Sequence, residues 1–179
     1  MSNNIEFDIF EKIPSKHFKK GEMIVRTGQK SNLAYFVVKG CLRSYIIDEK
    51  GKEHIYQFAP ENWIIGDLEF YKNKGNSFLN IDCIEASEVK AIEVNFFSEY
   101  SATSAEITEA SMKKLHNRIY ALQKRVIQLL SHSAEERYRE FIHTYPNLHS
   151  RISLKMIASY LGVTPESFSR VRKMLATKK

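Results

Sequence analysis

The stretch from Ile152 to Leu175 constrains the fold most, because its periodicity predicts two short amphipathic helices joined by a tight turn. Ser153 can cap the first helix, and Gly162 suits the left-handed residue that ends it. Thr164 can cap the second helix, with Pro165 at its first position. The residues expected to face inward are Leu154, Ile157, Ala158 and Leu161 in the first helix, Val163 in the turn, and Phe168, Val171, Met174 and Leu175 in the second.

The outward face of the second helix carries charged and hydroxyl side chains: Glu166, Ser169, Arg170, Arg172 and Lys173. A helix that is apolar beneath and rich in Arg and hydroxyl groups above can enter a DNA major groove. The alternative is an ordinary helical hairpin, in which Glu166 and Arg170 form a surface pair one turn apart.

Charge is distributed unevenly along the 179 residues, whose net charge is +6. Residues 111–179 hold fourteen Lys/Arg and four Asp/Glu, whereas residues 1–110 hold thirteen and seventeen. The basic part contains the two predicted helices, which is typical of a protein that binds a polyanion.

Between Phe18 and Val94, alternating residues and short apolar runs predict β-strands separated by glycine-bearing turns. The runs lie at 23–25, 34–38, 42–47, 54–58, 78–81 and 89–92. Many short strands at this spacing indicate an antiparallel sandwich or jelly roll. The apolar pattern of residues 1–16, which Pro14 ends, predicts a small helix or turn.

From Ser101 the pattern becomes helical, and six apolar residues follow one another at spacings of three and four. We call them the seam: Met112, Leu115, Ile119, Leu122, Val126 and Leu129. Such a narrow stripe predicts a parallel partner helix and hence a homodimer; the alternative is packing on the chain's own sheets. A helix over residues 103–132 would span about 45 Å, and Ser133-Ala-Glu-Glu136 is a capping box that starts the next helix.

The segment Leu-Gly-Val-Thr-Pro-Glu-Ser-Phe-Ser-Arg at 161–170 resembles the recognition segment of the Crp/Fnr family of bacterial transcription regulators. Segments 21–28, 34–40, 48–53 and 58–68 look like the β-roll of cyclic-nucleotide-binding domains. The resemblance implies an α+β protein with an antiparallel β-roll sensor domain (a double-stranded β-helix or jelly roll) over 1–100, a dimerisation helix over 101–132 and a helix-turn-helix domain over 133–179. Family members usually continue into a β-hairpin wing, and we expect a domain that lacks one, because the sequence ends four residues after Leu175.

Family members that bind cyclic nucleotides use a Gly-Glu-Leu-Ala carboxylate for the ribose and an Arg-Ser-Ala arginine for the phosphate. This chain has Gly66-Asp67-Leu68-Glu69, and the arginine position falls on Asn76 or Ser77. An anion without a cationic partner is costly to bury, so we expect no cyclic AMP binding by the usual contacts. The candidate effector residues are Gly66, Asp67, Leu68, Asn76, Ser77, Leu122 and Gln123.

By the same resemblance, Glu166, Ser169 and Arg170 are the expected base-reading residues, with Glu accepting from cytosine and Arg donating to guanine. Pro165 stands where some family members have an arginine. Phosphate contacts are expected from Thr164, Ser167, Arg172 and Lys173, with Ser153 and Lys155 as secondary candidates.

The sequence contains no catalytic arrangement, paired metal-ligand spacing, signal peptide or membrane span, and only two cysteines, Cys41 and Cys83. We therefore expect a cytoplasmic DNA-binding regulator rather than an enzyme, with double-stranded DNA, a second copy of the chain and RNA polymerase as partners, no membrane and no identified cofactor. The alternatives are a β-roll protein that senses an unidentified small-molecule effector, with weak or no DNA binding, a dimer that does not bind DNA and, more remotely, a cupin-type enzyme.

Overall fold

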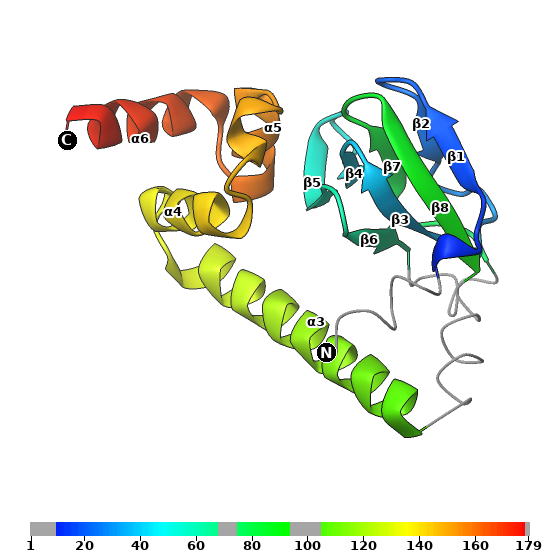
Figure 1. The fold of residues 1–179 in the computed structure, drawn as a ribbon. Helices are drawn as coiled ribbons and strands as arrows, with labels where there is room; N and C mark the ends of the chain where they lie inside the picture. The colour runs from blue at the N-terminus through cyan, green and yellow to red at the C-terminus, as the bar shows by residue number, and fades with distance from the viewer. Residues whose placement is uncertain (1–9, 68–74, 94–104, 178–179) are drawn as a thin grey trace. The chain divides into compact units, whose positions relative to one another are not determined.

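The computed structural model describes residues 10–67, 75–93 and 105–177, in which strands come first and helices follow (Figure 1). The chain divides into two compact units, Met1–Tyr100 and Ser101–Lys179. No described helix has the length and apolar character needed to cross a lipid bilayer.

The first unit consists of two four-stranded sheets in which every strand pair is antiparallel. One sheet has the order β1-β8-β3-β6 and the other β2-β7-β4-β5, which is the strand order of an eight-stranded jelly roll. This confirms the predicted β-roll. The strands are β1 (Ser15–Phe18), β2 (Met23–Val25), β3 (Leu33–Lys39), β4 (Leu42–Ile47), β5 (Glu53–Ala59), β6 (Ile64–Gly66), β7 (Asn80–Cys83) and β8 (Ser87–Glu93).

Alternating side chains of both sheets form the core of this unit. Tyr35 and Val37 of β3 pack in one cluster with Leu42 of β4, Ile81 of β7 and Val89 of β8. The two-residue period places these side chains on one face of each strand, as the sequence pattern predicts. Both cysteines are buried and neither forms a disulfide, and burial raises the pKa of the Cys83 thiol to about 11.

Three strands differ from the sequence pattern. Strand β7 begins at Asn80 instead of residue 78, because Phe78 lies in a bend where its side chain is 57 % exposed. Strands β1 and β6 are absent from the predicted set. Strand β1 has the sequence Ser-Lys-His-Phe with three exposed residues, and β6 is the short stretch Ile-Ile-Gly, so neither shows an apolar alternation. The predicted element in residues 1–16 lies mostly outside the described residues, of which Phe10 and Glu11 are helical.

The second unit contains a long helix followed by shorter ones. They are α3 (Ala105–Ser131), α4 (Ala134–Thr144), the 3-10 turn η2 (Leu148–Ser150), α5 (Leu154–Leu161) and α6 (Pro165–Thr177). The predicted capping box forms between α3 and α4: the backbone N–H of Ser133 donates to Glu136 Oε2 at 2.8 Å, and the Glu136 N–H donates to Ser133 Oγ at 3.3 Å. The backbone N–H of Ser133, and then its side chain, donate to the Glu136 carboxylate and lower its pKa. The capping box starts α4 where the sequence predicts it.

Helices α4, α5 and α6 share an aromatic core, and we call these three helices the head. The Tyr138 ring meets the Phe168 ring edge-on at 4.9 Å, and Phe141 packs against Tyr160 with ring centroids 5.6 Å apart. Tyr145 adds a third contact, with its ring 5.8 Å from that of Tyr160. Large rings bury much apolar area in few residues, so they suit a core formed by three short helices.

Candidate nucleic-acid interface

The turn between α5 and α6 has the predicted geometry. Ser153 Oγ accepts the Met156 N–H at 3.2 Å at the start of α5. Gly162 ends α5 in the left-handed conformation, with φ 68° and ψ 33°, and the next N–H returns to Ala158 O at 3.0 Å. Thr164 Oγ1 accepts the Ser167 N–H at 3.2 Å and so caps α6. Both helices therefore begin, and α5 ends, where the sequence predicts.

The buried side of the two helices is narrower than predicted. Ile157, Ala158, Leu161, Phe168 and Val171 are buried, which agrees with the predicted inward faces. The expectations for four other residues are wrong to different degrees: Leu154 and Met174 are 43 % and 48 % exposed, and Val163 and Leu175 are only half-buried. Leu154, Met174 and Leu175 lie at the outer ends of α5 and α6, and Val163 lies in the turn, all at the margin of the small aromatic core.

The outer side of α6 is exposed along its length, as predicted, at Glu166, Ser169, Arg170, Arg172 and Lys173. Among the described residues, no ion pair joins Glu166 to Arg170, although the charge of Arg170 contributes to the lowered pKa of Glu166. The pKa of Glu166 is lowered, first by its own backbone N–H and then by the Thr164 side chain, so this carboxylate is an ionised hydrogen-bond acceptor. The face thus offers one anionic acceptor and three cations.

The hydroxyl groups of this surface already serve local structure. Ser169 Oγ donates to Pro165 O at 2.9 Å, one turn back on α6. Thr164 Oγ1 and Ser167 Oγ lie 3.2 Å apart within the N-terminal cap. The three oxygens retain acceptor lone pairs, whereas Ser169 Oγ and Thr164 Oγ1 already direct their donors to protein atoms.

The seam residues lie along α3 with much of their apolar surface uncovered. Met112, Leu115, Ile119, Val126 and Leu129 are between 42 % and 55 % exposed, and Leu122 is half-buried. A row of apolar side chains with this exposure marks an interaction surface.

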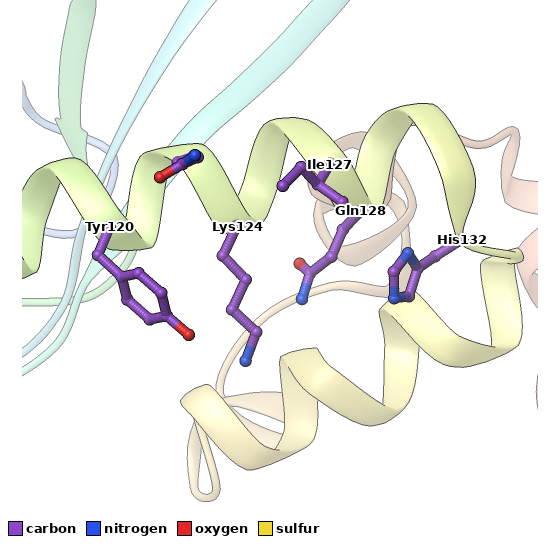
Figure 2. Close-up of a pocket in the computed structure, with 6 residues that line it drawn as sticks. Tyr120, Lys124, Ile127, Gln128 and His132 are labelled. Atoms are coloured by element: carbon purple, nitrogen blue, oxygen red, sulfur yellow. The ribbon is translucent and has the colours of Figure 1, made fainter.

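A pocket with a volume of about 320 Å³ lies beside this row, on the side of α3 that faces α4 (Figure 2). Its lining residues are Tyr120, Gln123, Lys124, Ile127, Gln128 and His132. Of the predicted effector residues, Gln123 is among them. Lys124 Nζ and Glu140 Oε1 of α4, 2.6 Å apart, form an ion pair between the two helices.

In the β-roll, the predicted effector residue Asp67 forms hydrogen bonds with residues 77–79 of the protein itself. Asp67 Oδ2 accepts the N–H groups of Phe78 at 2.6 Å and Leu79 at 2.8 Å, and it lies 2.9 Å from Ser77 Oγ. The backbone of Ser77 also bonds to the segment before β3. The Gly28 N–H donates to Ser77 O at 2.7 Å, and the Ser77 N–H donates to Gln29 O at 2.8 Å. Asp67 therefore binds the loop itself.

The remaining effector residues do not form a described cluster with Asp67. Asn76 pairs with Lys30 in an isolated β-bridge, and Gly66 ends β6 beside Ala34. Leu68 lies outside the described residues, and Leu122 and Gln123 belong to the second unit.

One residue with a clear structural role escaped the sequence analysis. Arg125 of α3 donates from Nη2 to Tyr160 O of α5 at 2.7 Å, and its guanidinium lies 3.7 Å from the centroid of the Tyr160 ring. The sequence shows only that Arg125 lies off the seam. No local pattern indicates a contact across 35 residues.

Comparison with known proteins agrees with this architecture. Residues 15–104 match the family model described as cyclic nucleotide-binding domain. Electron transport regulator A of Shewanella oneidensis is 29 % identical over 92 % of this chain and 68 % of its own length. The fumarate and nitrate reduction regulatory protein of Vibrio cholerae is 27 % identical over 94 % of this chain and 72 % of its own length.

The fold also matches the solved structure of FixK2 from Bradyrhizobium japonicum. The TM-score is 0.76 at 20 % identity, and the match covers 93 % of this chain and 85 % of that one. The regulatory relatives favour a regulator over an effector-sensing protein with weak or no DNA binding. The β-roll, the long helix and the helix-turn-helix thus lead to one conclusion: the chain belongs to the Crp/Fnr family of transcription regulators, with a cyclic nucleotide-binding domain at residues 15–104.

Proposed function

We propose that this regulator binds DNA in a sequence-specific manner as a homodimer and that α6 is its recognition helix. The observation that carries the proposal is the two-sided character of α6. Phe168 and Val171 are buried and fix α6 to the rest of the head. Glu166, Ser169 and Arg170 are exposed on its other side. A rigid helix that presents polar side chains is the element that enters a major groove.

The exposed residues divide into two roles. Arg170 can donate two hydrogen bonds to the O6 and N7 atoms of guanine, and ionised Glu166 can accept from cytosine N4. Arg172, Lys173 and the Ser167 hydroxyl are suited to phosphate oxygens, which position the protein without reading sequence. The Thr164 hydroxyl can join them when its proton turns away from Ser167 Oγ.

We propose that the seam is the surface through which two copies of the chain associate. Apolar residues at heptad spacing pack well against an identical parallel helix, which would cover the exposed side chains of α3. Two heads related by two-fold symmetry bind half-sites about one DNA turn apart, roughly 34 Å, so the target is an approximate palindrome. In this proposal, residues 1–100 form the sensor-type domain, 101–132 the dimerisation helix and 133–179 the DNA-binding domain.

The β-roll is proposed to act without cyclic AMP bound through the usual contacts. Asp67 stands at the position of the ribose-binding carboxylate, but its Oδ2 already accepts hydrogen bonds from the N–H groups of Phe78 and Leu79 and from Ser77 Oγ. A cyclic phosphate would also lack a cation, since no Lys or Arg occurs between Gly75 and Val89. We further propose a reducing, cytoplasmic setting and RNA polymerase as the partner that receives the signal.

The direct test is the selection of bound fragments from a random DNA pool with the full chain. We expect a near-palindromic consensus. A pool that stays random after selection would contradict sequence-specific binding.

With the selected site in hand, two substitutions separate the proposed roles. Arg170→Ala should cost about 1–3 kcal/mol on the selected site and relax one base position. Arg172→Ala should weaken binding to selected and random DNA alike and reduce the salt dependence of the binding constant by about one phosphate contact. Binding constants at two salt concentrations measure both effects. Equal losses on both kinds of DNA for both variants would refute this division.

A further inference from the structure

We infer that Arg125 is a positioning residue that fixes the recognition helix relative to the dimer seam and thereby sets the half-site spacing that the protein accepts. This inference rests on the proposed function. It concerns a side chain that lies in α3, outside the α6 face expected to meet DNA.

The contact of Arg125 with Tyr160 has two components, one to the backbone and one to the ring. The guanidinium donates to the Tyr160 carbonyl at 2.7 Å, and its central carbon lies over the Tyr160 ring, 3.7 Å from the centroid. A charge-assisted hydrogen bond fixes a distance, and stacking on a ring fixes an orientation. Together they hold α5 in one rotational position against α3.

Two neighbouring contacts join α3 to the other parts of the head. Lys124 pairs with Glu140 of α4 at 2.6 Å. A Cβ atom placed on Gly162 would lie 3.3 Å from Leu129 Cδ2, so the turn before α6 approaches α3 closely. The exposed Lys124–Glu140 pair contributes little energy by itself. Arg137 Nη1 of α4 donates to Leu129 O of α3 at 3.4 Å, a longer bond than the 2.7 Å bond of the half-buried Arg125.

Arg125 lies on α3 next to residues of the seam. Arg125 immediately precedes the seam residue Val126, and the Leu129 that approaches Gly162 is also a seam residue. The head is therefore attached to the same turns of α3 that would pack against the partner helix. With this attachment intact, the distance between the two recognition helices of a dimer is fixed by the seam.

The distance between the two DNA half-sites tests how rigidly the head is attached to α3. Inserting one base pair between two half-sites moves them apart by about 3.4 Å and rotates one by about 34°. Rigidly held heads cannot follow this change without losing base contacts. Heads that rotate about the α3–α4 junction can follow it, and they bind the best site more weakly because their orientation must be ordered on binding.

The experiment uses the full chain and the palindrome selected from the random pool, with zero, one or two base pairs inserted or removed at its centre. For the natural sequence we expect roughly a tenfold loss of affinity per inserted base pair. For Arg125→Ala we expect a loss of about threefold or less per base pair, with a lower affinity for the original site. An unchanged spacing profile in Arg125→Ala would overturn the inference.

Arg118→Ala is the matched control, because Arg118 lies one heptad earlier on the same side of α3 and its removal deletes the same charge. We expect this variant to keep the natural spacing profile; a broadened profile would show that charge alone is responsible and would overturn the inference. Thermal unfolding checks that each variant is folded. If Arg125→Ala does not fold, Arg125→Lys, which keeps the charge but not the planar stack, should broaden the profile partially, and a natural profile in that variant would count against the inference.

The experiment distinguishes failure of the proposed function from failure of the role proposed for Arg125. If the natural sequence selects no palindrome, DNA recognition is refuted before any spacing is compared. If it selects a palindrome and Arg125→Ala shows the natural profile, only the role of Arg125 is refuted.

Discussion

Strand β4 carries a buried arginine whose partners come from two other strands. Arg43 is 8 % exposed, and its Nε and Nη2 donate to the two carboxylate oxygens of Asp82 at 2.8 Å each. Nη1 donates to Glu53 Oε2 at 2.6 Å. Burial by itself would lower the pKa of Arg43, but the hydrogen bonds and charges of Asp82 and Glu53 raise it above its ordinary value. The buried guanidinium is therefore positively charged, and Asp82 and Glu53 offset the cost of burying that charge.

Replacement of Asp82 by alanine should be strongly destabilising, because it leaves a buried cation without its bidentate partner. We expect a loss of about 3 kcal/mol in the free energy of unfolding, measured with urea. Glu53→Ala is the matched comparison: the Glu53 side chain is 42 % exposed, so its removal should cost less than about 1 kcal/mol. Equal losses for the two variants would mean that burial does not determine the strength of these pairs.

The role assigned to Asp67 makes a second prediction at this scale. Asp67→Ala removes the acceptor of two backbone N–H groups and should cost about 1–3 kcal/mol of stability. Cyclic AMP should leave the melting temperature of the natural sequence unchanged, since a ligand that binds only the folded state must raise it. A saturable rise of the melting temperature with cyclic AMP would contradict the proposal that Asp67 binds residues 77–79 in place of a nucleotide.

At the scale of elements, local chemistry was readable from the sequence and long-range contact was not. Ser133, Ser153, Gly162 and Thr164 were all predicted as caps, because a cap involves residues only three or four positions apart. Strands β1 and β6 were missed because their stability comes from pairing with distant strands, β8 and β3. Arg125 was missed for the same reason.

The seam gives the prediction that belongs to this scale. Ile119→Asp should leave the fold of one chain nearly unchanged, because the Ile119 side chain is 53 % exposed there. It should prevent association, since two carboxylates would then face each other across the helix pair. Light scattering with size-exclusion chromatography measures the mass. Lys113→Asp, an exposed residue off the seam, should remain a dimer; a dimeric Ile119→Asp would contradict the seam.

At the scale of the whole molecule, two units share the work of one regulator. The sequence is acidic over residues 1–110 and basic over residues 111–179, and this change of charge lies close to the boundary between the two units. We predict that the basic unit is the part that binds DNA. The sequence also shows which segment resembles the nucleotide-binding motif of the family, Gly66-Asp67-Leu68-Glu69. It could not show that Asp67 already binds the adjacent loop, because that contact spans ten or more residues through backbone N–H groups.

The exposed row of apolar side chains on α3 has a quantitative consequence for gene control. If two copies must meet before one operator is occupied, occupancy at low abundance follows the square of the number of molecules in the cell. A twofold rise in synthesis would then give about a fourfold rise in promoter occupancy, with no messenger molecule required.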